Sequence, residues 1–207
     1  MSRRPCLIGI AGASCSGKTL LARRLAALVP GKAQVVSTDW YYRDLSHLDP
    51  DERTRWNFDA PEALDKDLFV NQLRALVQRA AVARPEYDFS THTRKAQPTR
   101  MDPGDWIIVE GLFALYWEEI RALLDVKVFM DVDEETGLAR RIARDVRERG
   151  RTEVSVRGQY AETVHPMYER YCLPTARFAD VIARGNDPID VSADTVLARL
   201  LPRMPMT

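Results

Sequence analysis

The sequence has few of the residues that mark a secreted, metal-binding or membrane-spanning protein. Its three cysteines, Cys6, Cys15 and Cys172, lie far apart and are odd in number, and no Cys/His spacing is typical of a metal site. This pattern favours free thiols in a reducing compartment, so we expect a cytoplasmic protein. No apolar run approaches the roughly 18 residues that a membrane helix needs, so we expect no membrane partner. The first residues also lack the long apolar segment and cleavage site of a signal peptide.

An excess of one charge is absent too, because 30 basic residues face 30 acidic ones. Nucleic-acid binders normally carry a visible basic excess, so we expect no nucleic-acid partner. Lysine is scarce, with 5 residues against 25 arginines. Arginine suits bidentate phosphate recognition, although genomic base composition explains the same bias. With 45% hydrophobic residues the chain has enough apolar surface to fold, and its 207 residues fit one domain.

Short apolar runs alternate with helical periodicity along the chain. This alternation predicts an α/β fold with a parallel sheet flanked by helices, and the phosphate-loop pattern of residues 12–19 narrows this to the P-loop NTPase type. We expect one domain over residues 1–207, with a small substrate-binding hairpin near 87–94 and a lid at about 140–158. The expected strands are 6–10, 33–37, 106–109, 126–132 and 181–183. The expected helices are 20–29, 61–83, 112–124, 134–149, 153–171 with a break near Pro166, and 191–201.

A glycine-rich segment between the first expected strand and helix matches the phosphate-loop pattern G-x-x-x-x-G-K-[ST]. Its glycines let backbone N–H groups turn toward a phosphate, and the following helix N-terminus adds partial positive charge. We expect Lys18 to reach the β- and γ-phosphates and Thr19 to bind Mg²⁺. The alternative is a glycine-rich turn that opens an ordinary helix. The segment consists of Gly12, Ala13, Ser14, Cys15, Ser16, Gly17, Lys18 and Thr19.

The signatures of other nucleotide-binding classes are missing. The sequence has no D-x-x-G with N-K-x-D, as GTPases have, and no L-S-G-G-Q, as transporter ATPases have. Their absence favours a small-molecule kinase. Asp39 and Glu110 follow two expected strands, and the carboxyl ends of parallel strands lie on the ligand side of a sheet. We therefore expect Glu110 to orient the metal and Asp39 to act as the base and as a metal ligand, although each is also consistent with a solvated carboxylate.

Six arginines fall within residues 140–151. On an ideal helix Arg140, Arg144, Arg147 and Arg151 share one face, and Arg141 points away from it. A solvated helix face and a nucleic-acid patch are two interpretations of such a run, the second opposed by the neutral net charge. The third is a mobile lid whose arginines bind the transferring phosphate and exclude water.

Several motifs in the same order resemble the uridine–cytidine kinases of pyrimidine salvage, over roughly residues 5–185. The resemblance rests on the phosphate loop and on further segments along the chain. These are 39–43, 57–61, 87–94, 109–111, the arginine stretch, 159–160 and 172–175.

The resemblance implies roles for individual residues. Asp39 corresponds to the general base for the ribose 5′-hydroxyl. Asp59 corresponds to the residue that binds the 2′- and 3′-hydroxyls, with help from Arg141 and Gln159. The positions implied to line the nucleoside pocket are Tyr42, Phe58, Tyr87 and His92, and those implied near the phosphates are Arg144, Arg149 and Arg151. Cys15 stands where the family usually has glycine.

We therefore expect a kinase that moves the γ-phosphoryl group of ATP or GTP to uridine or cytidine, with Mg²⁺. The resemblance also implies a homo-oligomer, a tetramer. Two alternatives stay open. One is a related kinase for another small alcohol, phosphoribulokinase-like or nicotinamide riboside kinase-like. The other is a nucleotide-binding regulator without phosphotransfer activity.

Overall fold

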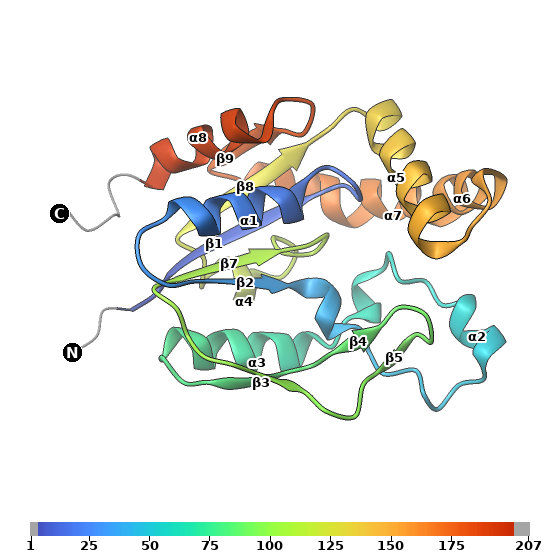
Figure 1. The fold of residues 1–207 in the computed structure, drawn as a ribbon, viewed down its shortest axis with the longest axis horizontal. Coiled ribbons are helices and arrows are strands. Elements are labelled where there is room, and N and C mark those ends of the chain that lie inside the picture. Colours follow the sequence, from blue (N-terminus) through green and yellow to red (C-terminus); the bar gives the residue numbers. More distant parts are fainter. Residues whose placement is uncertain (1–3, 201–207) are drawn as a thin grey trace.

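The computed structural model describes residues 4–200, and a sheet of five parallel strands runs through its middle (Figure 1). The strand order is β2-β7-β1-β8-β9, so every neighbouring pair is joined by a crossover rather than by a hairpin. The expected parallel sheet is thereby confirmed. The strands are β1 (Cys6–Gly12), β2 (Ala33–Ser37), β7 (Trp106–Glu110), β8 (Val126–Asp131) and β9 (Val181–Arg184).

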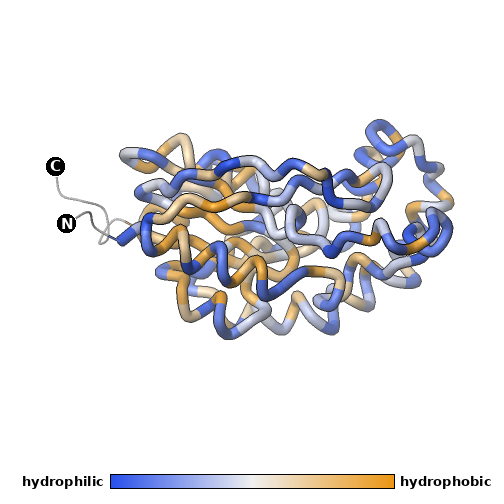
Figure 2. The backbone as a smooth tube through the Cα atoms, turned by 90° about the horizontal axis from the view of Figure 1, so that it is seen from below, coloured by the Kyte–Doolittle hydropathy of each residue, from blue (hydrophilic) through white to orange (hydrophobic). Residues whose placement is uncertain are grey.

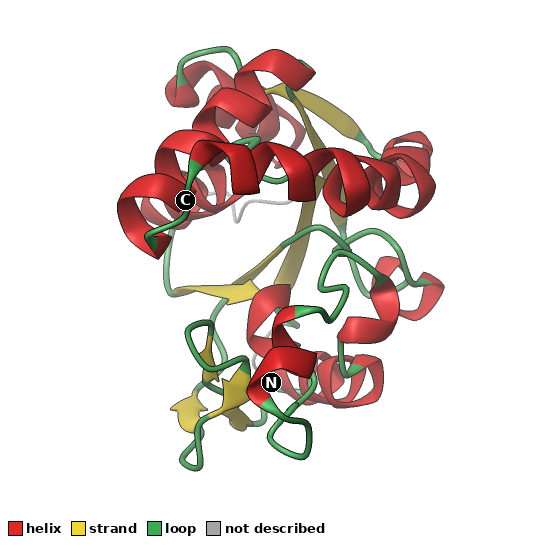
Figure 3. Cartoon of the chain, turned by 90° about the vertical axis from the view of Figure 1, so that its right-hand side faces the viewer, coloured by secondary structure: helices red, strands yellow, loops and turns green. Residues whose placement is uncertain are grey.

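The central strands are mostly apolar because both faces of the sheet are covered. Successive side chains point to opposite faces, so Ile8 and Ile10 of β1 enter one core while Leu7 and Ala11 enter the other. Helices α1 (Lys18–Leu28) and α8 (Ile189–Leu200) cover the first face. Helices α3 (Lys66–Val77) and α4 (Glu118–Arg121) cover the second (Figure 3).

The remaining helices lie largely beyond the carboxyl ends of the strands, at one end of the molecule (Figure 1). This end is mostly hydrophilic, whereas hydrophobic stretches gather in the middle of the molecule (Figure 2). The helices are α2 (Pro50–Thr54), α5 (Glu134–Arg149), α6 (Glu153–Gln159) and α7 (His165–Met167). Short 3₁₀ helices cover Thr38–Tyr41, Pro61–Ala63 and Leu173–Phe178, and π-helical turns cover Tyr160–Val164 and Tyr168–Cys172.

The expected helix 61–83 is wrong at both ends. Its α-helical part begins at Lys66 and ends at Val77, and Arg79 then adopts a left-handed backbone with φ 61°. The chain leaves the helix there and forms β3 (Val82–Arg84), which pairs antiparallel with β6 (Thr99–Met101). The β-branched start of β3 therefore belongs to a ribbon, not to the helix.

Two other expected helices are also corrected. Within 112–124 only α4 is an α-helix, because tight turns such as Ala114 N–H to Gly111 O direct Phe113 and Leu115 into the core. The stretch 153–171 does not break at Pro166. Pro166 lies in the first turn of α7, where no N–H partner is needed, and wider π-helical turns precede and follow it.

The expected hairpin is present as β4 (Tyr87–Asp88) and β5 (Thr93–Arg94), apart from the main sheet (Figure 3). The expected last helix begins at Ile189, and Leu201 lies outside the described residues. Between residues 4 and 200 no helix is long and apolar enough to cross a membrane.

Candidate functional site

The loop between β1 and α1 has the backbone that a phosphate cradle needs. Gly12, Cys15 and Gly17 take positive φ angles of 147°, 61° and 99°. A Cβ on Gly12 would lie 2.3 Å from the Met130 carbonyl oxygen, so only glycine fits against β8 there. Cys15 has the left-handed conformation that a glycine adopts more easily. The loop places Ser14, Cys15 and Ser16 at the end of the sheet where the strands finish.

Lys18, Thr19 and Glu110 meet beside this loop. The ammonium of Lys18 is almost buried and donates to the Ala13 carbonyl oxygen at 2.6 Å. The Thr19 hydroxyl donates to Glu110 Oε2 at 3.2 Å, and Glu110 is only 5% exposed. Burial, and next the charge of Asp39, raise the pKa of Glu110, while Lys18 opposes the shift. A hydroxyl and a carboxylate in this position suit Mg²⁺, which takes few protein ligands and otherwise binds water and phosphate oxygens.

Asp39 lies in the first turn after β2, in a 3₁₀ helix that directs it toward the phosphate loop. Its N–H donates to the Ser37 hydroxyl at 3.4 Å. Burial raises the pKa of Asp39, and the positive charges of Lys18, Arg144 and Arg149 counteract this. The structure thus brings Asp39, Glu110 and Lys18 together, as the sequence predicted.

Aromatic side chains from three segments form a cluster next to Asp39. Tyr42 contacts Phe58 edge-on at 5.3 Å between ring centroids and Tyr87 at 5.4 Å. Phe58 stacks on His92 at 4.6 Å with 22° between the planes. Phe89 joins the cluster against Tyr87 at 5.2 Å, which the sequence did not predict. These four predicted pocket residues therefore do lie together.

Two polar atoms in this cluster lack a partner. The Tyr87 hydroxyl and His92 Nδ1 are buried and make no hydrogen bond to any residue from 4 to 200. His92 also has a strained backbone with φ 55°, and burial lowers its pKa so that the neutral imidazole is favoured. Buried polar atoms are normally satisfied, so this pair indicates a place for a ligand that has hydrogen-bonding groups.

Asp59 faces the same space from the segment before α3. Burial raises the pKa of Asp59, and the Arg141 guanidinium is the main group that opposes the shift. Arg141 in turn donates to the Ser14 hydroxyl at 2.9 Å and to Gln159 Oε1 at 3.2 Å. The predicted diol-binding set of Asp59, Arg141 and Gln159 is therefore adjacent to the phosphate loop.

The arginine stretch differs from the expected helical face. Arg141, expected to point away from the face of the other arginines, is 6% exposed and donates to Ser14 of the phosphate loop. Arg151 is not on the helix, because Gly150 caps α5 with φ 63° and redirects the chain. Arg147 is exposed and pairs with its neighbour Glu148. Gly158, considered as a lid boundary, lies inside α6.

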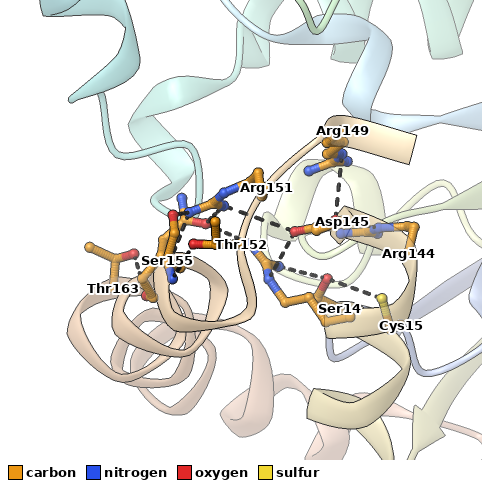
Figure 4. A network of polar contacts seen from close by, with 11 residues as sticks. Ser14, Cys15, Arg144, Asp145, Arg149, Arg151, Thr152, Ser155 and Thr163 are labelled. Carbon is orange, nitrogen blue, oxygen red and sulfur yellow. Dashed lines mark hydrogen bonds and ion pairs between the residues drawn. The ribbon is translucent and has the colours of Figure 1, made fainter. Parts of the chain in front are cut away.

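Asp145, like Phe89, lies in the site without having been predicted from the sequence. It is fully buried at the centre of the arginine cluster and accepts a hydrogen bond from Arg144 Nε at 2.8 Å (Figure 4). A signal was present, because Asp145 is four residues from both Arg141 and Arg149 and so shares their side of a helix.

The arrangement as a whole can hold a polyphosphate and an alcohol at the same time. The loop, Lys18 and the arginines supply positive charge and N–H donors on one side. The carboxylates of Asp39 and Asp59 and the aromatic cluster lie on the other. Asp39 lies between the two parts, where a proton acceptor for an attacking hydroxyl would have to be.

Comparison with known proteins gives a consistent result. The model of the phosphoribulokinase/uridine kinase family matches residues 7–192. The chain is 46% identical to a uridine kinase of Brevibacillus brevis, over 86% of this chain and 84% of that protein. It is 42% identical to a uridine kinase of Chloroflexus aurantiacus, over 97% and 96%. Among solved structures it resembles phosphoribulokinase from Rhodobacter spheroides, with a TM-score of 0.63, 16% identity, and coverage of 91% and 75%.

Proposed function

Because the chain belongs to the phosphoribulokinase/uridine kinase family, we propose that it transfers the γ-phosphoryl group of ATP or GTP to the 5′-hydroxyl of uridine or cytidine. The observation that carries this choice of acceptor is the aromatic cluster with its two unpartnered polar atoms. A pyrimidine is flat and has ring carbonyl and N–H or amino groups, which suit aromatic faces beside the Tyr87 hydroxyl and His92 Nδ1.

In this proposal Asp59 accepts hydrogen bonds from the two ribose hydroxyls, and Arg141 and Gln159 help to bind the ribose. A carboxylate is well suited to this, since hydrogen bonds to charged acceptors are the stronger ones. When Asp59 binds the ribose and Phe58 and His92 bind the pyrimidine ring, the 5′-hydroxyl is directed toward Asp39. Tyr42 lies near both carboxylates, which together with burial raise its pKa and keep its hydroxyl neutral.

Asp39 then accepts the proton of the 5′-hydroxyl as the oxygen attacks the γ-phosphorus. The raised pKa makes it a better base than an exposed carboxylate. The loop N–H groups and Lys18 hold the triphosphate, and Arg144, Arg149 and Arg151 balance charge on the transferring group. Thr19, Glu110 and Asp39 would hold Mg²⁺. Bound there, the ion would neutralise phosphate charge.

We also propose that residues 140–158 act as a lid over one domain and that the protein works in the cytoplasm as a homo-oligomer. The free thiols of Cys15 and Cys172 are consistent with a reducing compartment.

The experiment is ADP release from Mg·ATP with a panel of acceptors. The panel contains uridine, cytidine, adenosine, 2′-deoxyuridine, nicotinamide riboside, pantothenate and ribulose 5-phosphate. We expect turnover with uridine and cytidine that far exceeds the other acceptors. Turnover only with a different acceptor would keep the phosphate loop and Asp39 in their roles but would refute the pyrimidine pocket. ATP binding without any acceptor-dependent ADP release would favour a regulator.

A further inference from the structure

Among residues 4–200, Asp145 on α5 is the only acidic residue that pairs with Arg144, Arg149 and Arg151, the arginines predicted near the phosphates (Figure 4). It also contacts a fourth arginine, Arg141, which is predicted near the ribose. Its Oδ1 atom lies 2.8 Å from Arg144 Nε and 3.6 Å from Arg149 Nε. Its Oδ2 atom lies 3.7 Å from Arg141 Nε and 4.0 Å from Arg151 Nη1. The Asp145 side chain itself is completely buried, with no exposed surface.

The four contacts are unequal. Only Arg144 makes a hydrogen bond with the carboxylate. Asp145 Oδ2 is buried yet accepts no hydrogen bond from the described part of the chain, and neither does Arg141 Nε donate one there. A buried ion pair that served stability alone would use these atoms, because an unsatisfied buried carboxylate oxygen is costly. The guanidinium groups of Arg141, Arg149 and Arg151 are attracted to Asp145 by charge alone, without a hydrogen bond that would fix them to its carboxylate.

Each arginine also reaches another part of the site. Arg141 donates to Ser14 in the phosphate loop and to Gln159. Arg151 donates to Gln159 and to the Ser155 hydroxyl, the latter at 2.8 Å. Arg144 and Arg149 lie close enough to Asp39 to lower its pKa. The Asp145 carboxylate is therefore shared by arginines that face the proposed triphosphate site, the proposed general base Asp39 and the proposed ribose site.

We propose that Asp145 is a positioning residue that sets the spacing of these arginines above the phosphate loop. This inference rests on the proposed phosphotransfer function. Four guanidinium groups at this separation repel one another, and the Asp145 charge offsets that repulsion. Arg144 stays hydrogen-bonded to Asp145. Arg149 and Arg151, which are 45% and 26% exposed, exchange Asp145 for phosphate oxygens when the triphosphate binds.

The variant Asp145→Asn tests this, because it removes the charge and keeps the shape of the side chain. We expect kcat to fall at least tenfold, since the arginines separate from one another. We expect the Kd for Mg·ATP, measured by calorimetry without nucleoside, to stay within threefold or to tighten, because the site gains one positive charge. The matched control is Glu148→Gln, which makes the same charge change on an exposed residue of the same helix whose ion-pair partner among residues 4–200 is Arg147 alone. It should leave both quantities within twofold.

A merely structural role predicts a different pattern, in which kcat, ATP affinity and Tm all fall together. That result, or a kcat of Asp145→Asn within twofold of the parent, would overturn the proposal. A second measurement on the unmodified protein does not depend on the variant folding. On titration with Mg·ATP, the Nε–H NMR signals of Arg149 and Arg151 should shift while that of Arg144 keeps its position. Equal shifts for Arg144 and Arg149, or no shifts at all, would also contradict it.

The two arms separate this inference from the proposed function. The calorimetry and the NMR titration contain no nucleoside, so they remain informative about Asp145 even if uridine and cytidine prove not to be acceptors. Failure of the acceptor panel with normal ATP responses would refute the acceptor assignment alone.

Discussion

Gly111 offers a sharp test of how tightly the site is packed, because it follows Glu110, the proposed metal ligand, and packs against Thr38, the neighbour of the proposed base Asp39. It follows Glu110 with a φ of 150°, a conformation that side chains with a Cβ rarely adopt. A Cβ built there would lie 1.7 Å from Thr38 Oγ1, 2.8 Å from Thr38 Cβ and 3.0 Å from Thr38 Cγ2. Rotation of Thr38 about its Cα–Cβ bond therefore does not relieve the contact, because Thr38 Cβ itself is too close.

In Gly111→Ala the Thr38 hydroxyl must move by about 1.3 Å to reach the 3.0 Å that real Cβ contacts respect, and Asp39 is the next residue. A misplacement of about 1 Å at reacting groups costs on the order of 10²-fold in rate. We therefore expect kcat for uridine to fall about 10²-fold. Overpacking should also cost about 1–3 kcal/mol of unfolding free energy, which lowers the Tm by several degrees.

The assay is steady-state kinetics together with thermal unfolding of the purified variant. Gly158→Ala is the matched control, because nothing lies within 4 Å of a Cβ at Gly158 and the residue is inside helix α6. That variant should keep its activity and unfold at the same temperature or higher, since alanine favours a helix by about 1 kcal/mol over glycine. A Gly111→Ala enzyme with kcat within threefold of the parent would refute the close-packing argument.

Three further outcomes follow from the buried carboxylates. Asp59→Asn should raise the KM for uridine about tenfold or more, since hydrogen bonds to a charged group contribute about 1.5–3 kcal/mol. It should also reduce the preference for uridine over 2′-deoxyuridine. An unchanged ratio of the kcat/KM values for these two compounds would count against Asp59 as the diol ligand. Asp39 must be ionised to act as the base, and burial raises its pKa, so kcat/KM should fall as the pH drops through that pKa. Asp39→Asn should abolish this decrease at low pH and lower kcat about 10²–10⁴-fold. Burial also raises the pKa of Glu110 in the folded protein above its value in the unfolded chain. Protonation of Glu110 therefore stabilises the fold below the unfolded-state pKa, and this stabilisation is lost as the pH rises through the folded-state pKa. Glu110→Gln should accordingly raise the Tm of the ligand-free protein near pH 7.5, and a lower Tm there would show that the Thr19 contact outweighs the burial cost.

The sheet could be predicted because each central strand is an apolar run with a breaker on both sides. Trp106–Glu110, for instance, begins soon after Pro103 and Gly104 and ends at Gly111. The phosphate loop could be predicted equally well, since its glycines lie where the backbone requires positive φ. In both cases the local sequence and the fold demand the same residues.

The errors occur where tertiary contacts override local preference. Residues 112–124 have helical periodicity, yet Phe113 and Leu115 are directed into the core by turns, and only Glu118–Arg121 stays helical. Arg79 ends α3 in a left-handed conformation that no sequence rule assigns to arginine. Such positions are fixed by what they pack against, which a single sequence does not show.

The site was predicted in its members but not in its geometry. Motif order indicated Asp39 and Asp59, which both lie near Tyr42, and His92, which stacks on Phe58. The side of α5 that faces the site was predicted wrongly, because helical spacing alone does not say which face is turned inward. Arg141 is buried against Ser14. The helical spacing of Asp145 to Arg141 and Arg149 indicates their contacts, but the contact with Arg151 beyond the helix end depends on the turn at Gly150.

The most direct test of the central claim compares uridine with 5′-deoxyuridine, which lacks the proposed attacking hydroxyl but keeps the base and the ribose diol. We predict rapid ADP release from Mg·ATP with uridine, and formation of a 5′-monophosphate. With 5′-deoxyuridine we predict no turnover and competitive inhibition against uridine, because Asp59 and the aromatic cluster would still bind it. ADP release at a similar rate with both compounds, or no response to uridine, would contradict the account.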